Sequence, residues 1–484
     1  MIATTEAGQA VTVEARALSR AAYAARTRQP QKTAPVRIVH LGLGAFHRAH
    51  QAWFTDQVDD DAEWGIAAFT GRNPQAALEL APQDGLFTLV ERSEAGDSAT
   101  IVTSIVEAVD GADLARLRDL LAAPTTSVVT LTITEAGYRL RADGLPNLTD
   151  PAVLADVSWL REAFAADALP DARQGGPTTT LGRLLLGLEA RRRAGAGPLA
   201  IVSCDNIPDN GVFLAGGLGE LARLTSPALA GWIDAEASFV STSVDRITPR
   251  TTPTDLAAAA ALTGWHDDAA VVTEPFRDWV LSGSFPAGRP AWERAGARFV
   301  DDIEPFERRK LWMLNGAHSL LAYAGLVRGH ESVAQAMADP VCRGWVNDWW
   351  DDVIRHLPAD GLALDDYRAA LLTRFDNTRI EHRLGQISGE AVTKLRVRIV
   401  PTVLAERAAG RESSAGIRAI GSWVALVLAG YPLADADSEV VAAALAAGED
   451  GALERLLTLI DERLAADESL VAAIRAVAAE VAPE

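Results

Sequence analysis

The sequence predicts a two-domain chain: an α/β, doubly wound domain over residues 1–288, followed by an all-α domain over residues 289–484. Two observations support this fold class. Short β-branched runs alternate with helical segments through the first half, whereas beyond about Arg289 apolar residues recur at helical spacing. A chain of 484 residues can also bury two sizeable cores. Residues 1–32 lack the apolar core of a signal peptide, so we expect them to form a capping arm.

The composition excludes several classes of partner. A formal net charge of −20 argues against nucleic acid and anionic membranes, although a small anionic substrate needs only a local basic pocket. No run of about 18 uncharged apolar residues appears, so no membrane span is predicted. Cys204 and Cys342 cannot build a disulfide framework, and neither has Cys or His neighbours at zinc spacing. We therefore expect a cytoplasmic protein with a metal-free site.

The first strand ends in a glycine turn. Residues 36–51, VRIVHLGLGAFHRAHQ, predict a strand, a turn at Gly42 and Gly44, and a helix. Such a turn lets backbone N–H groups approach a pyrophosphate at the helix N-terminus, which indicates a Rossmann-like domain that binds NAD. His47 stands at the third glycine position of the full fingerprint, and a lone glycine turn is about as often an ordinary βα connection.

The second strand favours no single dinucleotide. We expect it at Trp64–Gly71, and a Rossmann fold usually places an acid near the end of this strand to hold the ribose hydroxyls of NAD. The sequence there has Arg72 and no acid. Arg72 could face a 2′-phosphate, which would allow NADP, or it could equally be a solvated loop residue.

Polar residues follow the ends of later predicted strands. These strands are expected within Leu86–Arg92, Thr100–Val109, Ser127–Tyr138, Leu199–Gly211 and Phe239–Arg250, and in the fourth segment the strand gives way to Asp205, Asn206 and a Pro/Gly loop. Thr134 and Glu135, then Asn206, and then Asp245 lie at or just beyond three of the ends, where ligands bind in doubly wound sheets. Asn206 precedes Ile-Pro, so it can also be an ordinary turn residue. Later helices are expected at Ser332–Trp350, Leu362–Asn377, Ile380–Gly385, Glu412–Ala429 and Ser438–Val481.

One predicted helix, Glu304–Gly329, carries polar residues among apolar ones. Lys310, Asn315 and His318, together with Glu307, fall within an arc of roughly 140° at helical spacing. Burial disfavours the charged form of a lysine, which could then act as a base. We expect this helix where the two domains meet, with the ligand cleft beside it. The alternative is a lysine that reaches solvent, with a satisfied core Asn and His.

The residues resemble a known family, the polyol-specific long-chain dehydrogenases that include mannitol dehydrogenase and fructuronate reductase. The resemblance covers nearly the whole chain, and the K-x4-N-x2-H spacing is the family's catalytic signature. The motifs that carry it are GLGAFHRAHQ at Gly42, APQDGLFTLVER at Ala81, TLTITEAGY at Thr130, SCDNIPDNG at Ser203, VDRITPRT at Val244, TEPFRDWV at Thr273, KLWMLNGAHSLLAY at Lys310 and RFDN at Arg374.

The resemblance implies a metal-independent, NAD(P)-linked oxidation of a secondary alcohol in an open-chain sugar alcohol or aldonate. It implies Lys310 as the general base, Asn206 and Asn315 as holders of the reacting oxygen, and His318 as a positioning group. It also suggests that a single chain is the active unit. Further substrate contacts are implied at Asp245, Lys394 and Gln386, and cofactor contacts at Gly42, Gly44, Phe46, Arg72, Thr134 and Glu135.

The sequence departs from the family at several positions. Ala136 stands where relatives commonly have lysine, and Glu390–Val392 replaces a usual Asp-Gly-Ser. Mannitol dehydrogenases more often have arginine where this chain has Gln386, whereas the frame H-x3-QI…K-L-x2-R resembles fructuronate reductases. Lys394, Arg396 and Arg398 could bind a substrate carboxylate, or they could equally be surface charges.

These observations predict a reversible NAD(P)-dependent oxidoreductase that interconverts D-fructuronate and D-mannonate. The alternative within the family is mannitol 2-dehydrogenase, acting on D-mannitol and D-fructose, or another sugar alcohol dehydrogenase. A different class is a dinucleotide-sensing protein without catalysis, against which the intact set of Lys310, Asn315 and His318 argues.

Overall fold

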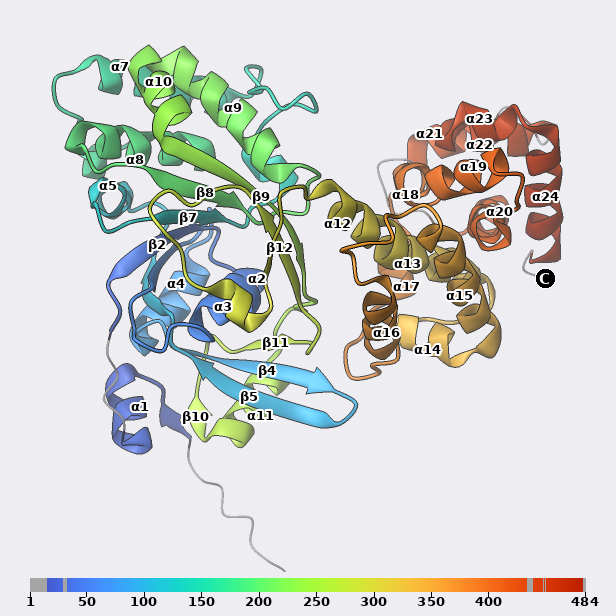
Figure 1. Cartoon of the computed structure of the whole chain (residues 1–484), viewed down its shortest axis with the longest axis horizontal. Coiled ribbons are helices and arrows are strands. Elements are labelled where there is room, and N and C mark those ends of the chain that lie inside the picture. The colour runs from blue at the N-terminus through green and yellow to red at the C-terminus, as the bar shows by residue number, and fades with distance from the viewer. Residues whose placement is uncertain (1–14, 29–32, 433–437, 447, 449, 482–484) are drawn as a thin grey trace, which may run out of the picture. The chain divides into compact units, whose positions relative to one another are not determined.

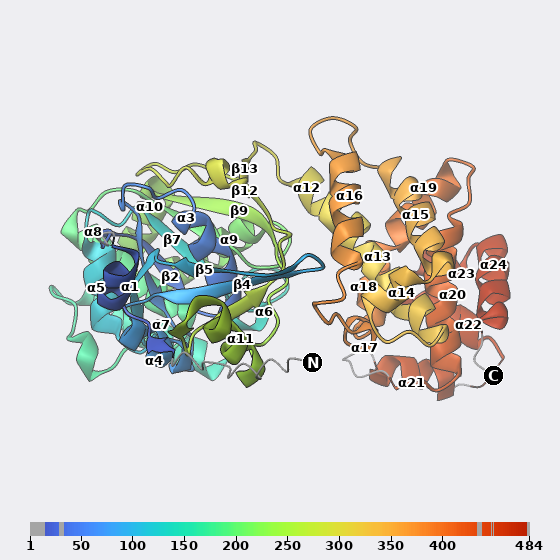
Figure 2. The ribbon, with the colours of Figure 1, turned by 90° about the horizontal axis from the view of Figure 1, so that it is seen from below.

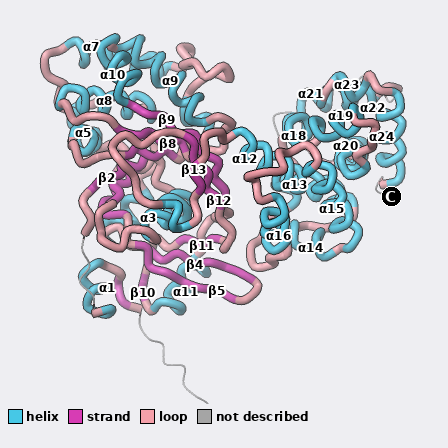
Figure 3. Tube along the Cα trace, viewed as in Figure 1, coloured by secondary structure: helices cyan, strands magenta, loops and turns pink. Residues whose placement is uncertain are grey.

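The computed structural model describes residues 15–28, 33–432, 438–446, 448 and 450–481. The chain divides into two compact units, Met1–Ile303 and Glu304–Glu484. The first unit is built from strands and helices, and the second from helices, as Figures 1 and 3 show. The predicted fold class is therefore confirmed. No helix of the described part is long and apolar enough to cross a membrane.

The first unit is organised around an eight-stranded sheet. Its strand order is β13-β12-β9-β8-β7-β2-β3-β6, in which the six strands from β9 to β6 are parallel. Counted from β2, those six strands have the order 3-2-1-4-5-6 of a Rossmann fold. β12 pairs antiparallel with β9. The strands are β2 Val36–Leu41, β3 Gly65–Phe69, β6 Ile105–Val109, β7 Val128–Leu131, β8 Leu199–Ser203, β9 Ala237–Asp245, β12 Asp278–Ser282 and β13 Arg298–Phe299.

The alternation of side chains along each parallel strand builds two cores. In β2, Val39 and Leu41 belong to one apolar cluster, whereas Ile38 belongs to the other. Because successive side chains of a strand point to opposite faces, both faces of the sheet are covered. Helices α5, α7, α8, α9 and α10 cover the first face, and α3 packs on the second (Figure 1).

The helices of the first unit connect these strands. Their bounds are α1 Arg20–Thr27, α2 Ala45–His47, η1 Arg48–Ala52, α3 Trp53–Asp56, α4 Gln75–Leu80, η2 Ala81–Gln83, α5 Leu114–Ala122, α6 Glu135–Tyr138, α7 Pro151–Ala165, η3 Ala172–Gln174, α8 Thr180–Ala194, α9 Asn210–Thr225, α10 Pro227–Glu236, α11 Pro253–Thr263 and η4 Trp292–Ala295.

Two smaller sheets complete the first unit. β4, Phe87–Ser93, lies between β5, Gly96–Val102, and β11, Val271–Thr273. Figure 2 shows the β4–β5 hairpin projecting from the unit. The single strand expected at Thr100–Val109 is thus two strands, β5 and β6, in different sheets. The break falls at Thr103, whose backbone N–H donates to Asp56 Oδ1 at 2.6 Å instead of to a neighbouring strand.

The expected capping arm is described in part. Residues 1–14 and 29–32 lie outside the described residues. The remainder holds β1, Arg16–Ala17, which pairs with β10, Trp265–His266. Leu18 packs against the Trp265 ring, and the Arg26 guanidinium lies 3.7 Å from the centre of that ring.

The helical unit begins at Glu304 rather than at residue 289. Residues between these positions form η4 and β13, and β13 pairs with β12 at the edge of the main sheet. The buried Trp292 indole also donates to Thr55 Oγ1 at 3.0 Å. A single turn and two strand residues carry too short a pattern to be recognised from sequence.

The second unit packs its helices around the buried helix α20, which contacts α15, α24, α13 and η6. The helix expected at Ser332–Trp350 is two helices, α14 and α15. Asp339 caps the N-terminus of the second one, and Pro340 takes its first position. The bounds are α12 Glu304–Arg309, η5 Lys310–Asn315, α13 Gly316–Leu320, η6 Leu321–Gly325, α14 Val333–Ala338, α15 Pro340–Ile354, α16 Leu364–Phe375, α17 Leu384–Ile387, α18 Ala391–Arg398, α19 Val400–Ala408, α20 Ser414–Leu428, α21 Ser438–Ala446, α22 Ala452–Ile460, α23 Glu462–Ala465 and α24 Glu468–Glu480.

Candidate active site

The glycine turn lies at the carboxyl end of β2. Gly42 has φ of +115°, and a Cβ there would lie 2.0 Å from the Thr132 carbonyl oxygen, so only glycine fits. Gly44 is the N-cap of α2, and without a side chain it leaves the first N–H groups of the helix without a side-chain cap. That arrangement fits a dinucleotide pyrophosphate. Phe46 follows in α2 and stacks on His50.

His47 packs beneath the turn at the third glycine position. Its ring stacks on His40 of β2, with 3.3 Å between the ring centres. The His40 ring bonds to Thr130 Oγ1 at 2.8 Å and Thr132 Oγ1 at 3.0 Å, so it ties β2 to β7. Burial lowers the pKa of His40 to about 3. The histidine pair is therefore a neutral support for the turn.

The segment after β7 turns away from the sheet earlier than expected. The strand ends at Leu131, and residues 135–138 form α6 rather than continuing the strand. The Ile133 N–H donates to the Asp205 carboxylate instead of to a strand. Thr134 is the N-cap of α6, and Glu135 begins that helix; both side chains are exposed.

The loop after β8 is held by two buried side chains. Asp205 accepts hydrogen bonds from Tyr138 and, at 3.2 Å, from Ser203 Oγ, and burial raises its pKa to about 7. Asn210 donates to the Asp205 carbonyl at 2.7 Å and exchanges bonds with the Thr242 backbone. These contacts fix the backbone on which the exposed Asn206 lies. Their spacing, D-N-x3-N, is a signal that sequence reasoning missed.

The predicted residues of the first unit share one edge of the sheet. Gly42, Thr134, Asn206 and Asp245 lie at or follow the carboxyl ends of β2, β7, β8 and β9, which are neighbours. Asp245 is half-buried and lies opposite Asp278 of β12. Arg72 lies beyond the end of β3, next in the sheet to β2, and its side chain is exposed.

The helix expected from Glu304 contains a π turn at the predicted catalytic residues. The chain is helical from Glu304 without interruption, but η5 changes the hydrogen-bond register from four residues to five. Five residues span 500° in an α-helix, which separates Lys310 from Asn315 by about 140°. At π register the same five residues make little more than one full turn. The side chains of Lys310, Asn315 and His318 therefore fall within an arc of roughly 60° around the helix axis.

Two tryptophans of α15 satisfy carbonyl groups of the π turn. The Trp349 and Trp350 indole N–H groups each donate at 2.9 Å, to the carbonyls of Trp312 and Met313 respectively. Gly316 allows this approach, because a Cβ there would lie 2.7 Å from Trp349 Nε1. The wide turn is therefore held by specific packing.

His318 is buried beside this turn. Its ring centre lies 4.8 Å from that of Phe375 and 4.7 Å from that of His382. Burial lowers its pKa well below the usual value, and the nearby His382, Arg374 and Arg398 lower it further. Among the described residues its Nε2 atom has no hydrogen-bond partner. A neutral imidazole with an open nitrogen can bond to a substrate hydroxyl.

The three cations of the 394–398 segment differ in their contacts. Lys394 Nζ donates to the Ile387 carbonyl at 3.1 Å and lies 3.8 Å from a Glu390 oxygen. Arg396 donates to the Leu459 and Ile460 carbonyls at the end of α22. Arg398 Nη1 lies 3.4 Å from the Asn315 carbonyl. Gln386 lies on α17, four residues from His382, and its side chain is exposed. The short helix α17 begins at Leu384, later than the helix expected at Ile380.

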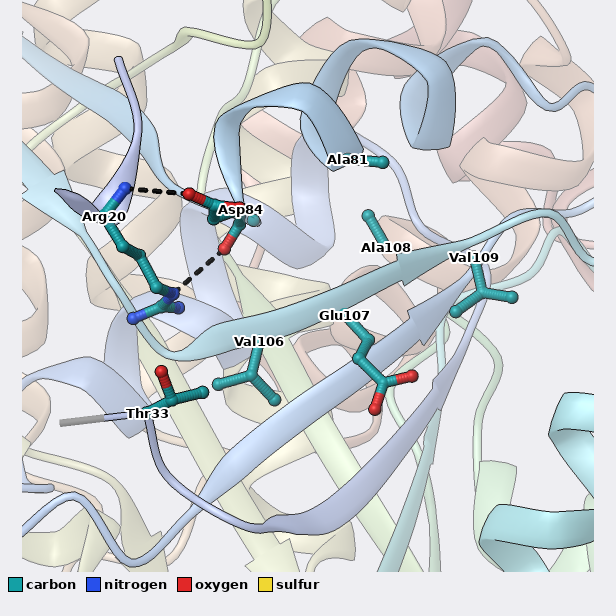
Figure 4. Close-up of a pocket in the computed structure, with 9 residues that line it drawn as sticks. Arg20, Thr33, Ala81, Asp84, Val106, Glu107, Ala108 and Val109 are labelled. Atoms are coloured by element: carbon teal, nitrogen blue, oxygen red, sulfur yellow. Dashed lines mark hydrogen bonds between the residues drawn. The ribbon is translucent and has the colours of Figure 1, made fainter. Parts of the chain in front are cut away.

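A pocket of about 370 Å³ in the first unit is lined by none of the predicted site residues (Figure 4). Arg20, Asp84 and Glu107 line it, and the Arg20 guanidinium donates to the carbonyls of Asp84, Thr103 and Ile105. Because Arg20 joins α1 to the rest of the unit, this pocket lies at the junction where α1 packs on the unit.

One cluster of the described residues has the composition of a metal site. Donor atoms of His330, Asp339 and Cys342 lie within 4.8 Å of one another, which the sequence spacing around Cys342 did not reveal. However, Asp339 Oδ2 accepts from Arg328 Nε at 2.6 Å and is 3.0 Å from His330 Nε2. The second Asp339 oxygen caps α15. The arginine already balances this carboxylate.

Comparisons with known proteins agree with the fold. Residues 36–294 match the model of the mannitol dehydrogenase Rossmann domain, and residues 302–478 match that of the mannitol dehydrogenase C-terminal domain. D-mannonate oxidoreductase of Escherichia coli (strain K12) is 35% identical, over 76% of this chain and 75% of its own. A mannitol 2-dehydrogenase of Aspergillus terreus is 37% identical, over 76% of this chain and 73% of its own. The structure of Pseudomonas fluorescens mannitol 2-dehydrogenase with NAD and D-mannitol has a TM-score of 0.74 at 32% identity, covering 93% of this chain and 92% of that one.

Proposed function

Because the chain belongs to the mannitol dehydrogenase family, we propose that it is an NAD-dependent secondary-alcohol dehydrogenase that interconverts D-mannonate and D-fructuronate. NAD is the proposed cofactor because the glycine turn fits a pyrophosphate and because the related Pseudomonas fluorescens structure contains NAD. Bound NAD supplies the hydride acceptor. Gly42 and Gly44, with Phe46, Thr134 and Glu135 around the same edge, would hold it, and Arg72 would face the 2′-phosphate if NADP binds instead.

The side chains on the π turn supply the proton chemistry. As the carbinol C–H bond breaks, the hydroxyl becomes acidic and the Lys310 amine accepts its proton. The amide N–H group of Asn315 donates to the developing alkoxide, and such a donor can contribute about 3 kcal/mol. In the reducing direction Lys310 returns the proton. His318 bonds to a neighbouring hydroxyl and orients the substrate.

One observation carries this proposal: the π turn brings Lys310, Asn315 and His318 onto one face beside a buried, unpartnered imidazole nitrogen. π turns inside α-helices occur frequently at functional sites, and a helix with only a structural role does not need one.

A sugar acid is preferred over a neutral polyol because of the charges around His318. Arg374 and Arg398 lie close enough to His318 to lower its pKa, and an arginine can bind a carboxylate. The relative named D-mannonate oxidoreductase supports the same choice. The second candidate is D-mannitol with D-fructose, favoured by the two relatives named mannitol 2-dehydrogenase.

Lys310→Ala tests the chemistry. We expect kcat to fall by about 10²- to 10⁴-fold for the best substrate, while NADH binding, followed by fluorescence, is retained. Arg308→Gln is the matched control, because Arg308 lies on the same helix, pairs with Glu304 and takes no part in the proposed reaction. Unchanged turnover in Lys310→Ala would exclude the mechanism, whereas no turnover by the wild type with NADH binding retained would support a non-catalytic, dinucleotide-sensing protein.

The substrate is tested by comparing kcat/KM for D-mannonate, D-mannitol and D-arabinitol with NAD and with NADP. We expect the highest value for D-mannonate. A higher value for D-mannitol would replace the proposed substrate with the second candidate and leave the role of Lys310 intact.

A further inference from the structure

Arg398, the last residue of α18, has unused hydrogen-bonding capacity. Its side chain is half-buried, and this burial lowers its pKa from the usual value. Its hydrogen bonds within the described part of the chain are confined to Nη1, which lies 3.4 Å from the Asn315 carbonyl and 3.3 Å from Ser319 Oγ. Both are long for hydrogen bonds. Within the part of the chain that the structure describes, no carboxylate forms an ion pair with it.

Arg191 shows how a structural arginine is satisfied in the same chain. Its three nitrogens donate to five backbone carbonyls, at distances of 2.8 to 3.2 Å. A guanidinium carries five N–H donors, and a buried cation is costly unless such partners surround it. Arg398 leaves Nε and Nη2 without a partner among the described residues. Those two nitrogens form one side of the planar fork that binds a carboxylate with two parallel bonds.

The position of Arg398 links this fork to the proposed reaction. Both of its contacts lie on the helix of the π turn: Asn315 is the proposed alkoxide donor, and Ser319 follows His318. The positive charge is also close enough to His318 to act on it electrostatically. The fork therefore lies beside the residues proposed to hold the reacting carbon.

We propose that Arg398 is the specificity-determining residue of this site, binding the terminal carboxylate of an open-chain sugar acid in a bidentate ion pair. This inference rests on the proposed function. It distinguishes Arg398 from the two other cations of α18, because Arg396 is bonded to carbonyls of α22 and Lys394 to Ile387 and Glu390. A neutral polyol offers no group that uses the fork.

The experiment compares a sugar acid with a neutral polyol on matched variants. For Arg398→Gln we expect kcat/KM for D-mannonate to fall about 10- to 100-fold, mainly through KM, because the contact is the same in the ground and transition states. For D-mannitol the fall should stay below about threefold. Arg398→Lys should recover part of the loss. Arg396→Gln, two residues away, should change neither substrate.

Three outcomes decide between the proposals. Equal losses on both substrates, with no recovery in Arg398→Lys, would show that Arg398 only supports the π turn and would overturn the inference. If the wild type oxidises D-mannitol but not D-mannonate, D-mannonate is excluded as the substrate, but an inhibition experiment still tests the role of Arg398. In that case D-mannonate should inhibit D-mannitol oxidation by the wild type and not by Arg398→Gln; no inhibition of the wild type would refute carboxylate binding.

Discussion

Replacing Asp205 with asparagine should change the pH dependence of stability in the first unit. The carboxyl of Asp205 is buried at the end of β8, where burial raises its pKa from 3.8 to about 7. The bonds from Tyr138, Ile133 and Ser203 oppose this shift without cancelling it. In the unfolded chain the same carboxyl ionises near its ordinary value.

The sign follows from the proton count. Between about pH 4 and pH 7 the folded chain holds a proton on Asp205 that the unfolded chain has lost, so raising the pH favours unfolding. The shift of about three pKa units corresponds to about 4 kcal/mol, spread over this window at up to about 1.4 kcal/mol per pH unit. Asparagine has no proton to lose, so Asp205→Asn removes this dependence. The stabilising contribution of Asp205 to the free energy of unfolding is fully present below pH 4 and is lost as pH rises through 7.

Scanning calorimetry of the wild type and Asp205→Asn between pH 4.5 and 8 measures this effect. For a unit of about 300 residues, 4 kcal/mol corresponds to about 6 °C in Tm. We expect the wild-type Tm to fall by up to that amount relative to the variant as the pH rises. Asp209→Asn, an exposed position in the same loop, controls for the loss of one charge. A difference in Tm that stays constant, or that moves the other way, would refute the reasoning.

Three further predictions concern other parts of the chain. Gly42→Ala should lower the free energy of unfolding of the first unit by about 2 to 5 kcal/mol, because its Cβ would meet the Thr132 carbonyl. Gly44→Ala should cost much less in denaturant titrations, because its Cβ would make only an ordinary contact, 3.6 Å from the Gly42 carbonyl oxygen. Glu406→Gln should destabilise the second unit by about 2 kcal/mol, because buried Glu406 accepts bonds from Arg355, His356 and Arg411. These partners hold the pKa of Glu406 below its usual 4.5, so the difference from the glutamine variant should be present above about pH 4.5 and shrink in acid unfolding. Arg72→Ala should lower kcat/KM with NADP about tenfold and leave that with NAD unchanged, as cofactor titrations would show; equal effects would count against a 2′-phosphate contact.

Patterns confined to a few neighbouring residues predicted the fold well. The short apolar or β-branched runs of β2, β3, β7, β8 and β9 mark the parallel sheet, and the glycine turn at Gly42 depends on a local backbone conformation. The ends of strands, and the breaks between them, depend on residues that are far away in the sequence. β7 stops early because Asp205 takes the Ile133 N–H, and the break before β6 is set by Asp56. Neither partner is close to its target in sequence.

The candidate site could be predicted only as residue types. Lys310, Asn315 and His318 stand out from the sequence, but helical periodicity of 3.6 residues cannot show that a π turn narrows the angle between them. The segment 394–398 presents three cations that look equivalent. Only contacts made across more than 60 residues, from Arg396 to the end of α22, separate Arg396 from Arg398.

The π turn also fixes how this helix can vary. A segment with five-residue register holds one more residue than the α-helical turn that it replaces, so the geometry of the lysine and the amide is set by chain length rather than by side-chain choice. Deleting one residue within it would restore an ordinary helix, in which four residues span about 400°, nearly the angle that five residues span at π register, so later positions would keep their orientation. Substitutions can therefore alter the chemistry of this helix one group at a time, and the extra residue of the wide turn can be lost without moving the groups on either side of it off their shared face.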